Sequence, residues 1–197
     1  EVYGIDILNE VLRLCPARIK TTELDVLEDR FPFPDEYFDL ITAVEVIEHL
    51  PCGDNFFSES SRTLEKGGYL LITAPNLASW ANRLLLLFGY QTTSVPQPSC
   101  YHTVGLPTKI RRRSCAPARI RRRELQHVCG YTLRALKDML SIYGFRIVHE
   151  EGIPTPYANL LVSYLEKVFS RTVSLAGTLL ILAEKHGTGM KDEGKPN

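Results

Sequence analysis

The feature that most constrains the fold is an apolar stretch, Phe38–Val44, that ends in a turn rich in acidic side chains. Its residues are mostly apolar and β-branched, which is typical of a strand inside a sheet. The turn that follows carries Glu45, Glu48 and His49. The sequence therefore predicts a buried strand whose end presents two carboxylates and an imidazole.

Strands and helices alternate in the predicted order of elements. Strands are predicted at residues 1–7, 19–26, 38–44, 69–74, 145–150 and 177–184, and helices after residue 9, at 54–64, within 76–89, at 133–143 and at about 157–169. We expect Asn9, Asp54 and Thr132 to cap the helices that they introduce. Gly67 and Gly68 are expected to end helix 54–64. This alternation predicts an α/β sheet with helices on both faces.

The composition is that of one soluble globular domain. The chain has 197 residues, of which 44% are hydrophobic and 23% are charged, and its formal net charge is zero. The five cysteines are widely spaced and form no Cys-x-x-Cys pair, so neither a zinc ribbon nor a disulfide framework is indicated. A reduced, cytoplasmic setting is the default for such a chain. The apolar runs 84–88 and 179–183 are too short to span a membrane.

The charges are distributed unevenly along the chain. Eleven acidic residues and one basic residue lie between Glu23 and Glu59. The segment Lys109–Arg123 has eight basic residues and no acidic one. A basic run of this kind favours phosphate groups, so nucleic acid is a candidate partner through Arg111–Arg123. The run lacks the interleaved aromatic side chains that stack on bases, and the alternative is a solvated insert or lid.

Two blocks of sequence resemble the second half of a class I S-adenosylmethionine-dependent methyltransferase domain. One is Phe38–Pro51, with its Glu-Val-Ile-Glu-His turn, and the other is Leu64–Asn76, with Leu-Glu-Lys-Gly-Gly before an apolar run. Lys66 stands where the small-molecule methyltransferases of this group usually have proline. The resemblance covers residues 1–185 except an insert or lid at about 91–126. It implies a Rossmann-like, doubly wound and mostly parallel α/β sheet with a terminal antiparallel strand.

The family's first strand and its Gly-x-Gly loop have no counterpart in this sequence. The strand that ends at Asp6 already corresponds to the family's second strand, so the domain is expected to be N-terminally truncated. In the family's strand order, the missing strand lies between Val2–Asp6 and Phe38–Val44. We expect two unpaired edges there, unless they close on each other, and impaired cofactor binding by this chain. Residues 186–197 are predicted to be a disordered tail.

The resemblance assigns cofactor contacts to residues at the ends of strands. Asp6 is implied to accept hydrogen bonds from the ribose hydroxyls of S-adenosylmethionine, and Asp25 and Val26 are implied to lie beside the adenine. The further pocket residues that it implies are Ile7, Val44 and Glu45. From position alone, Asp6 and Asp25 are equally explained as capping or loop acids. An acid at the position of Asp6 also occurs in nicotinamide-dinucleotide domains.

Glu45, Glu48 and His49 are spaced so that a helical turn would place them on one face. With His127, they could hold Mg²⁺ or Mn²⁺, as a comparable turn does in some O-methyltransferases that this chain resembles. In relatives without a metal, the turn lines the cofactor pocket, and His49 or His127 is the candidate catalytic base. A purely structural role is the third alternative.

The function that the resemblance implies is methyl transfer to oxygen, nitrogen or carbon of a small-molecule acceptor. The sulfonium of the cofactor is already activated, so the protein has to align the acceptor and remove its proton. Two alternatives stay open. One is an RNA methyltransferase that uses the basic run Arg111–Arg123, and the other is a non-catalytic interaction module that has kept the fold.

Overall fold

The computed structural model describes residues 1–95, 105, 107, 127–155 and 160–187. The basic run Arg111–Arg123, most of the predicted insert 91–126 and most of the predicted tail 186–197 therefore lie outside the described residues. Among the described helices, none is long and apolar enough to cross a membrane.

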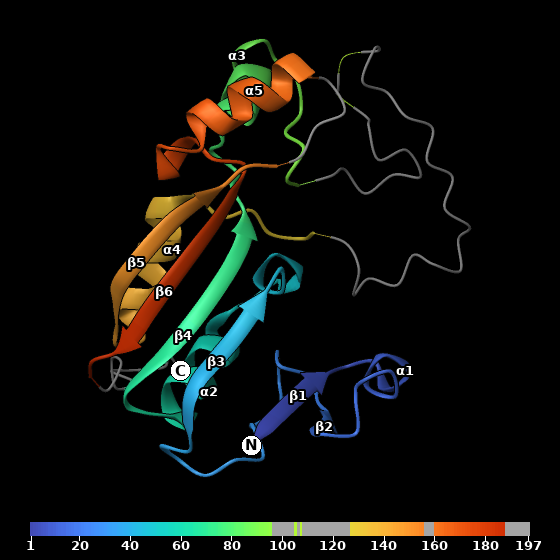
Figure 1. Cartoon of the computed structure of the whole chain (residues 1–197), viewed down its shortest axis with the longest axis vertical. Coiled ribbons are helices and arrows are strands. Elements are labelled where there is room, and N and C mark those ends of the chain that lie inside the picture. Colours follow the sequence, from blue (N-terminus) through green and yellow to red (C-terminus); the bar gives the residue numbers. More distant parts are fainter. Residues whose placement is uncertain (96–104, 106, 108–126, 156–159, 188–197) are drawn as a thin grey trace, which may run out of the picture.

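The described part of the chain alternates between strands and helices, as the sequence predicts (Figure 1). The strands are β1 (Val2–Asp6), β2 (Ile19–Glu23), β3 (Phe38–Val44), β4 (Leu64–Pro75), β5 (Phe145–Ile153) and β6 (Thr178–Lys185). The α-helices are α1 (Asn9–Leu12), α2 (Asp54–Thr63), α3 (Trp80–Leu87), α4 (Leu133–Ile142) and α5 (Leu160–Phe169). The short 3-10 helices are η1 (Ile47–His49) and η4 (Val173–Leu175).

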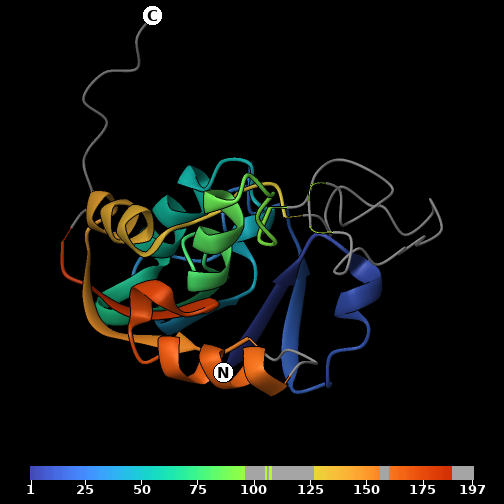
Figure 2. The same ribbon diagram turned by 90° about the horizontal axis from the view of Figure 1, so that it is seen from above.

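These strands form two separate sheets. β1 and β2 make a parallel pair, and the second sheet has the order β3-β4-β6-β5. β3 is parallel to β4, whereas β6 is antiparallel to both of its neighbours. The Rossmann-like α/β fold with parallel and antiparallel strands is thus confirmed. β1 and β3 do not pair with each other, and Figure 2 shows the β1–β2 pair and α1 set apart from the larger sheet.

The core lies between the larger sheet and the helices α2 and α4, which cover one of its faces (Figures 1 and 2). Alternate residues of β4 and β6 point into this core, which is the periodicity of a half-buried strand. Its fully buried side chains include Phe57, Leu70, Ile72, Leu136, Leu140 and Ile181. Strand β3 is less buried than predicted, because Leu40 is 52% and Val44 58% exposed. Among the strands of the described residues, β3 has a hydrogen-bonded neighbour on one edge only.

The two consecutive glycines do not end helix α2, so that prediction is wrong. The helix stops at Thr63 and β4 begins at the next residue. Gly67 has a positive φ of 81°, and a Cβ on Gly68 would lie 3.1 Å from the carbonyl oxygen of Phe38. These glycines allow β4 to bulge and then lie close against β3, where the pairing register jumps.

The predicted helix caps are confirmed at one position and wrong at two. The Thr132 hydroxyl accepts a hydrogen bond from the amide of Ala135 (3.2 Å) at the start of α4. Asn9 and Asp54 are instead the first residues of their helices. The Asp54 carboxylate accepts a hydrogen bond from the Tyr143 hydroxyl (2.6 Å), which competes with capping of its own helix.

Asn76 fastens the carboxyl end of β4 to the segment that leads into β6. Its side-chain amide donates to the carbonyl oxygens of Ser174 (3.1 Å) and Ala176 (2.9 Å) and accepts from the amide of Ala78 (2.9 Å). The side chain is fully buried, so no water replaces these bonds when they are lost. The residue therefore fixes the carboxyl end of β4 against the segment that precedes β6.

We expect Asn76→Ala to lower the free energy of unfolding by about 2–4 kcal/mol, because it leaves buried carbonyl and amide groups unpaired. The change is measured by urea denaturation followed by circular dichroism. Asn9→Ala is the matched control, since Asn9 is exposed and its side-chain bonds to Glu23 and Arg13 lie at the surface. Equal stability losses in the two variants would contradict this role of Asn76.

Candidate active site

A pocket of about 430 Å³ lies at the carboxyl ends of β1, β2 and β3. Its lining residues are Ile5, Asp6, Ile7, Leu8, Val11, Leu24, Asp25, Val26, Leu27, Glu45, Val46, His49 and Leu50. Ligands of open α/β sheets bind in this place, outside the carboxyl ends of strands. The structure thus brings together five of the six predicted cofactor residues. The sixth, Val44, is 58% exposed and does not line this pocket.

The two predicted acids of the pocket are anchored in their loops. An oxygen of Asp6 accepts a hydrogen bond from the amide of Leu8 (2.7 Å), and an oxygen of Asp25 accepts one from the amide of Leu27 (2.9 Å). These bonds agree with the structural alternative that the sequence left open. Each bond uses one carboxylate oxygen, and a carboxylate offers a second oxygen to a ligand hydroxyl or amine. Anchoring also orients the carboxylate toward the pocket that it lines.

Helix α2 supports one wall of the pocket through Asn55, which the sequence analysis missed. Its side-chain amide donates to the carbonyl oxygens of Val26 and Asp29, both at 3.0 Å. Asp29 in turn accepts a hydrogen bond from the amide of Asp25 (2.9 Å). The loop after β2 is therefore held by polar contacts with a distant helix, and no local sequence pattern predicts these contacts.

Glu45 lines the pocket, and its negative charge is close enough to Glu48 to raise the pKa of that carboxyl. It has a positive φ of 53° and precedes helix η1. A shared face of Glu45, Glu48 and His49 stays a prediction. The Glu45 carboxylate accepts a hydrogen bond from the Thr73 hydroxyl (3.1 Å), on the neighbouring strand β4. A non-glycine residue in the left-handed region stores backbone strain, and such strain is often found at functional sites.

Glu48, His49 and His127 come together beside the pocket. Their potential ligand atoms all lie within 4.8 Å of one another, and the two imidazole rings meet edge to face with centroids 5.0 Å apart. The carbonyl oxygen of Glu48 accepts hydrogen bonds from the amides of Val128 (2.8 Å) and Cys129 (3.1 Å). These backbone bonds place His127 beside Glu48, although the two residues are far apart in the sequence.

The hydrogen bond of His127 to Ser94 defines which ring nitrogen is free. Nδ1 of His127 lies 2.9 Å from the carbonyl oxygen of Ser94, which can only accept, so Nδ1 carries the proton. In the neutral ring, Nε2 then has a lone pair. Nε2 of His127 lies 3.8 Å from a carboxylate oxygen of Glu48, so its lone pair is on the side of the ring that faces the cluster. Ser94 belongs to the segment that showed no regular pattern in the sequence.

The Glu48 carboxylate is almost fully buried, at 1% exposure, and no described residue makes a hydrogen bond to either of its oxygens. Burial raises the pKa of Glu48 to about 7, and the negative charge of Glu45 raises it as well, while His127 opposes the shift. A buried carboxylate without hydrogen-bond donors favours a proton or a cation as its partner. Because His49 also lines the pocket, this cluster borders the pocket.

We expect Glu48→Gln to remove a loss of stability that the natural chain shows between about pH 4.5 and pH 7. The folded protein binds the Glu48 proton more tightly than the unfolded chain, so the stability contribution is complete below the unfolded pKa and disappears as pH rises through the folded pKa. At pH 8 the variant should be more stable by roughly 1–3 kcal/mol. Urea titrations from pH 5 to pH 8 measure this.

The exposed Glu65→Gln is the control, and its unfolding curve should follow that of the natural chain across the same pH range. A natural chain whose stability does not fall between pH 5 and pH 7 relative to Glu48→Gln would contradict a raised pKa at this buried carboxyl.

Comparison with known proteins agrees with this architecture. The chain is 33% identical over 84 residues to a phthiotriol/phenolphthiotriol dimycocerosates methyltransferase of Mycobacterium ulcerans, which covers 39% of this chain and 31% of that protein. It is 33% identical over 73 residues to a fatty-acid O-methyltransferase of Mycolicibacterium smegmatis, which covers 36% of this chain and 27% of that protein. The match thus spans less than a third of either relative.

Solved structures show the same fold. An S-adenosylmethionine-dependent methyltransferase from Mesorhizobium loti superposes with a TM-score of 0.55 and 15% identity, over 93% of this chain and 79% of that one. The family model described as a methyltransferase domain matches residues 1–150, which include every wall of the pocket and all three members of the cluster. The chain therefore belongs to the methyltransferase-domain family, whose class I members use S-adenosylmethionine.

Proposed function

We propose that this chain is the catalytic domain of an enzyme that transfers a methyl group from S-adenosylmethionine to an oxygen atom of a small apolar acceptor. The observation that carries the proposal is the position of His49. It lines the pocket at the strand ends and also belongs to the Glu48–His49–His127 cluster. A cofactor in the pocket would therefore end beside two imidazoles and a buried carboxyl, which are groups that can take up or release a proton.

The cofactor, when bound, supplies an activated methyl group. The residues present fit its nucleoside end. Asp6 and Asp25 line the pocket with anchored carboxylates, which suit the ribose hydroxyls and the adenine amine, respectively. Ile7 and Val26 add apolar walls for the sugar and the ring.

His127 is the proposed general base. Its Nε2 lone pair, held by the bond from Nδ1 to Ser94, would take the proton of an acceptor hydroxyl as the new oxygen–carbon bond forms and the methyl–sulfur bond breaks, with S-adenosylhomocysteine as the leaving group. The imidazolium that results lies 3.8 Å from the Glu48 carboxylate, which favours the ionised form of that carboxyl. Glu48 would thus stabilise the protonated base without touching the acceptor, and His49 would orient the acceptor from the pocket wall.

A second candidate arrangement is a divalent cation held by Glu48, His49 and His127. The buried carboxylate without a hydrogen-bond donor fits such an ion, and two imidazole nitrogens complete three ligands. With Glu45 outside the group, one carboxylate and two imidazoles suit Mn²⁺ better than Mg²⁺, which prefers oxygen ligands. Calorimetric titration with MnCl₂ decides between the two arrangements, since only the metal site gives binding that Glu48→Gln abolishes.

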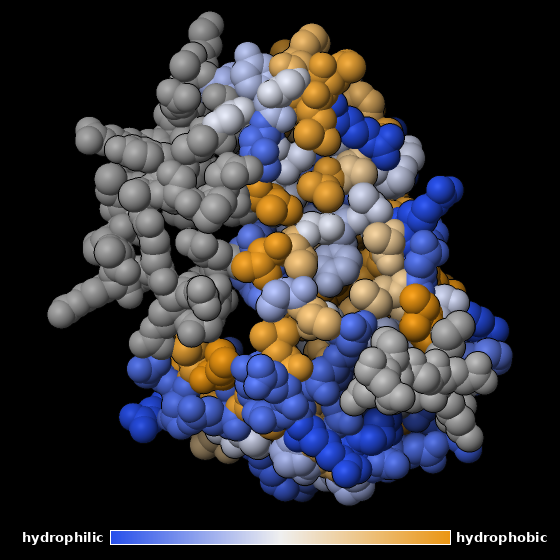
Figure 3. All heavy atoms as spheres, turned by 180° about the vertical axis from the view of Figure 1, so that it is seen from behind, coloured by the Kyte–Doolittle hydropathy of each residue, from blue (hydrophilic) through white to orange (hydrophobic). Residues whose placement is uncertain are grey.

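Two observations support an apolar acceptor. One of the relatives is named for fatty-acid O-methylation. In addition, apolar side chains gather at the end of the molecule formed by α3 and α5, as Figures 1 and 3 show together. Exposed members of this group are Leu84, Leu86, Leu87, Phe88, Leu160, Leu161 and Tyr164. Exposed apolar groups of this extent commonly contact apolar ligands or partners. Methylation of RNA rests on Arg111–Arg123 and on the possible metal ligands Glu48, His49 and His127, and a steep salt dependence of substrate binding would favour it.

We expect Asp6→Asn to weaken binding of S-adenosylhomocysteine at least about tenfold, because the amide replaces one charged acceptor of the ribose hydroxyls. Isothermal titration calorimetry on the full chain measures the change. Asp138→Asn is the control, since Asp138 is exposed on α4 and does not line this pocket. Equal affinities of Asp6→Asn and the natural chain would contradict the assignment of the pocket.

We expect His127→Ala to lower kcat about 100-fold or more while the affinity for S-adenosylhomocysteine changes less than about twofold, since the imidazole acts on the acceptor proton. Transfer of a radiolabelled methyl group to long-chain fatty acids and hydroxylated lipids measures kcat. The control is His149→Ala, in which an exposed imidazole on β5 is lost. The base assignment fails if both histidine variants keep the activity of the natural chain.

A further inference from the structure

Helices α3 and α5 are joined to each other at one end of the molecule (Figure 1). The indole of Trp80 stacks on the ring of Phe169, with centroids 5.1 Å apart, and its Nε1 donates a hydrogen bond to the carboxylate of Glu166. The other oxygen of this buried carboxylate accepts hydrogen bonds from the amides of Thr155 (3.1 Å) and Gly177 (2.8 Å). The two helices are therefore held as one unit, and their outer residues form one surface.

This α3–α5 surface is apolar although it faces outward (Figure 3). Leu160 is 89%, Leu87 75% and Phe88 71% exposed, and four further large apolar side chains of the two helices are at least 46% exposed. Apolar area of this extent is unfavourable in water. A contiguous group of such side chains is typical of a surface that contacts a partner or a membrane.

The charge on the α3–α5 surface is positive. Residues 77–95 and 160–176 contain three basic side chains, Arg83, Lys167 and Arg171, and all three are exposed. Their one carboxylate is Glu166, which is fully buried. Among the residues that the structure describes, none of the three cations forms an ion pair. The surface therefore combines apolar side chains with free positive charge.

A basic hollow of about 650 Å³ adjoins this surface, between α3 and the start of α4. Its charged lining residues are Arg83, Arg134, Lys137 and Asp138. Lys137 is paired with Glu150 (2.5 Å), whereas Arg83 and Arg134 have no carboxylate partner in the described part of the chain. The Arg83 guanidinium donates hydrogen bonds to two backbone carbonyls, which fix its position and leave its charge. A guanidinium held in this way suits a phosphate oxygen.

We propose that the α3–α5 surface docks on an anionic lipid bilayer. Leu87, Phe88 and Leu160 enter the boundary between headgroups and acyl chains. Lys167 and Arg171 lie among the lipid phosphates, and the basic hollow accepts a further phosphate. A lipid surface matches both properties of this end of the molecule, because it offers acyl chains and negative charge side by side. The chain would lie on the bilayer, since none of the described helices is long and apolar enough to cross it.

Helix α3 also connects this surface with the candidate base. The side-chain amide of Asn82, which is buried in α3, donates a hydrogen bond to the hydroxyl of Ser94 (2.7 Å). The carbonyl oxygen of Ser94 accepts the hydrogen bond from Nδ1 of His127 (2.9 Å). A docked α3 would thus set the base close to the lipid surface, from which an apolar acceptor can enter. This step rests on the proposed function.

The probe is a vesicle of phosphatidylcholine, alone or with about 30% of the anionic lipid phosphatidylglycerol. Binding of the full 197-residue chain is measured by co-sedimentation at physiological salt, without any cofactor. We expect binding at least about tenfold stronger to the anionic vesicles, because the free cations gain from the negative surface potential. Equal binding to both kinds of vesicle, or no binding to either, would overturn the proposal.

Two matched pairs of variants locate the contact. Leu87→Gln should weaken binding to the anionic vesicles about tenfold, whereas Leu14→Gln, at an equally exposed leucine between α1 and β2, should not. Arg171→Gln should weaken it about fivefold and the exposed Arg18→Gln should not. Unchanged melting temperatures exclude unfolding as the cause. Vesicle binding that all four variants leave unchanged would place the contact elsewhere, such as at Arg111–Arg123, and overturn the proposal.

Sedimentation velocity without lipid tests a second copy of the chain as the occupant. We expect a monomer from the natural chain and from Leu87→Gln alike. A dimer that Leu87→Gln dissociates and Leu14→Gln does not would make a second copy the occupant and overturn the proposal.

Titration with S-adenosylhomocysteine separates docking from the proposed function. Leu87→Gln should keep the affinity for S-adenosylhomocysteine within about twofold, because Leu87 does not line the cofactor pocket. Vesicle binding without any cofactor binding supports the docking surface and contradicts the proposed function. Cofactor binding without vesicle binding does the reverse.

Discussion

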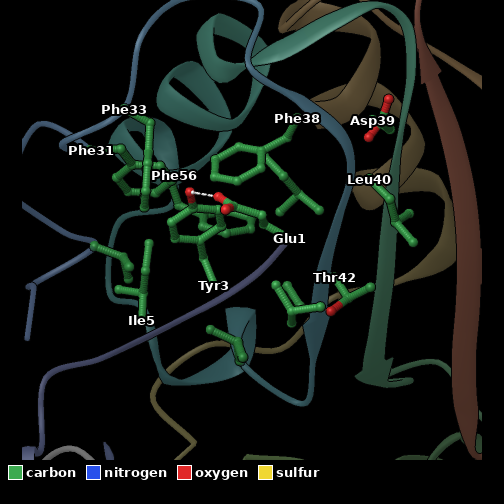
Figure 4. A pocket seen from close by; sticks show the side chains of 15 residues that line it. Glu1, Tyr3, Ile5, Phe31, Phe33, Phe38, Asp39, Leu40, Thr42 and Phe56 are labelled. Atoms are coloured by element: carbon green, nitrogen blue, oxygen red, sulfur yellow. Dashed lines mark hydrogen bonds between the residues drawn. The ribbon is translucent and has the colours of Figure 1, made fainter. Parts of the chain in front are cut away.

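The structure depends on a constraint that applies to every interior strand of a parallel sheet, which is that both of its edges need hydrogen-bonded partners. β1 and β3 each have one partner in the described chain. The strands are therefore divided into two sheets, with a groove between them (Figure 4). Leu40 and Val44 on β3 are exposed for the same reason, although the composition of β3 is that of a buried strand. The cofactor pocket is affected by the same constraint, because Ile5, Val26 and Val46 line both the pocket and the groove.

A second organising contact is the backbone carbonyl of Glu48. It accepts the amides of Val128 and Cys129, and so brings His127 beside the turn after β3. One oxygen of the buried Glu48 carboxylate then lies 3.8 Å from an imidazole nitrogen of His127 and 4.0 Å from one of His49. Burial is the main cause of the raised pKa of this carboxyl, and His127 opposes the shift. The proposed proton transfer depends on this arrangement of Glu48, His49 and His127.

Local sequence patterns predict the alternation of strands and helices, because each element is encoded by neighbouring residues. The pocket residues, such as Asp6, came from the resemblance to the family, and five of the six line the pocket. Local patterns do not predict contacts between residues far apart in the sequence. The positive φ of Glu45 and its bond to Thr73 on β4 are examples. Gly67 and its neighbour serve a bulge against β3, although they look like a helix stop. Ser94 and Asn55 support the site through contacts that have no local pattern.

The most direct test of the account is a crystal structure of the chain with S-adenosylhomocysteine. The account predicts the ribose at Asp6, the adenine beside Asp25 and Val26, and the sulfur directed toward His49. A structure in which the ligand lies outside the pocket at the strand ends would contradict the central claim.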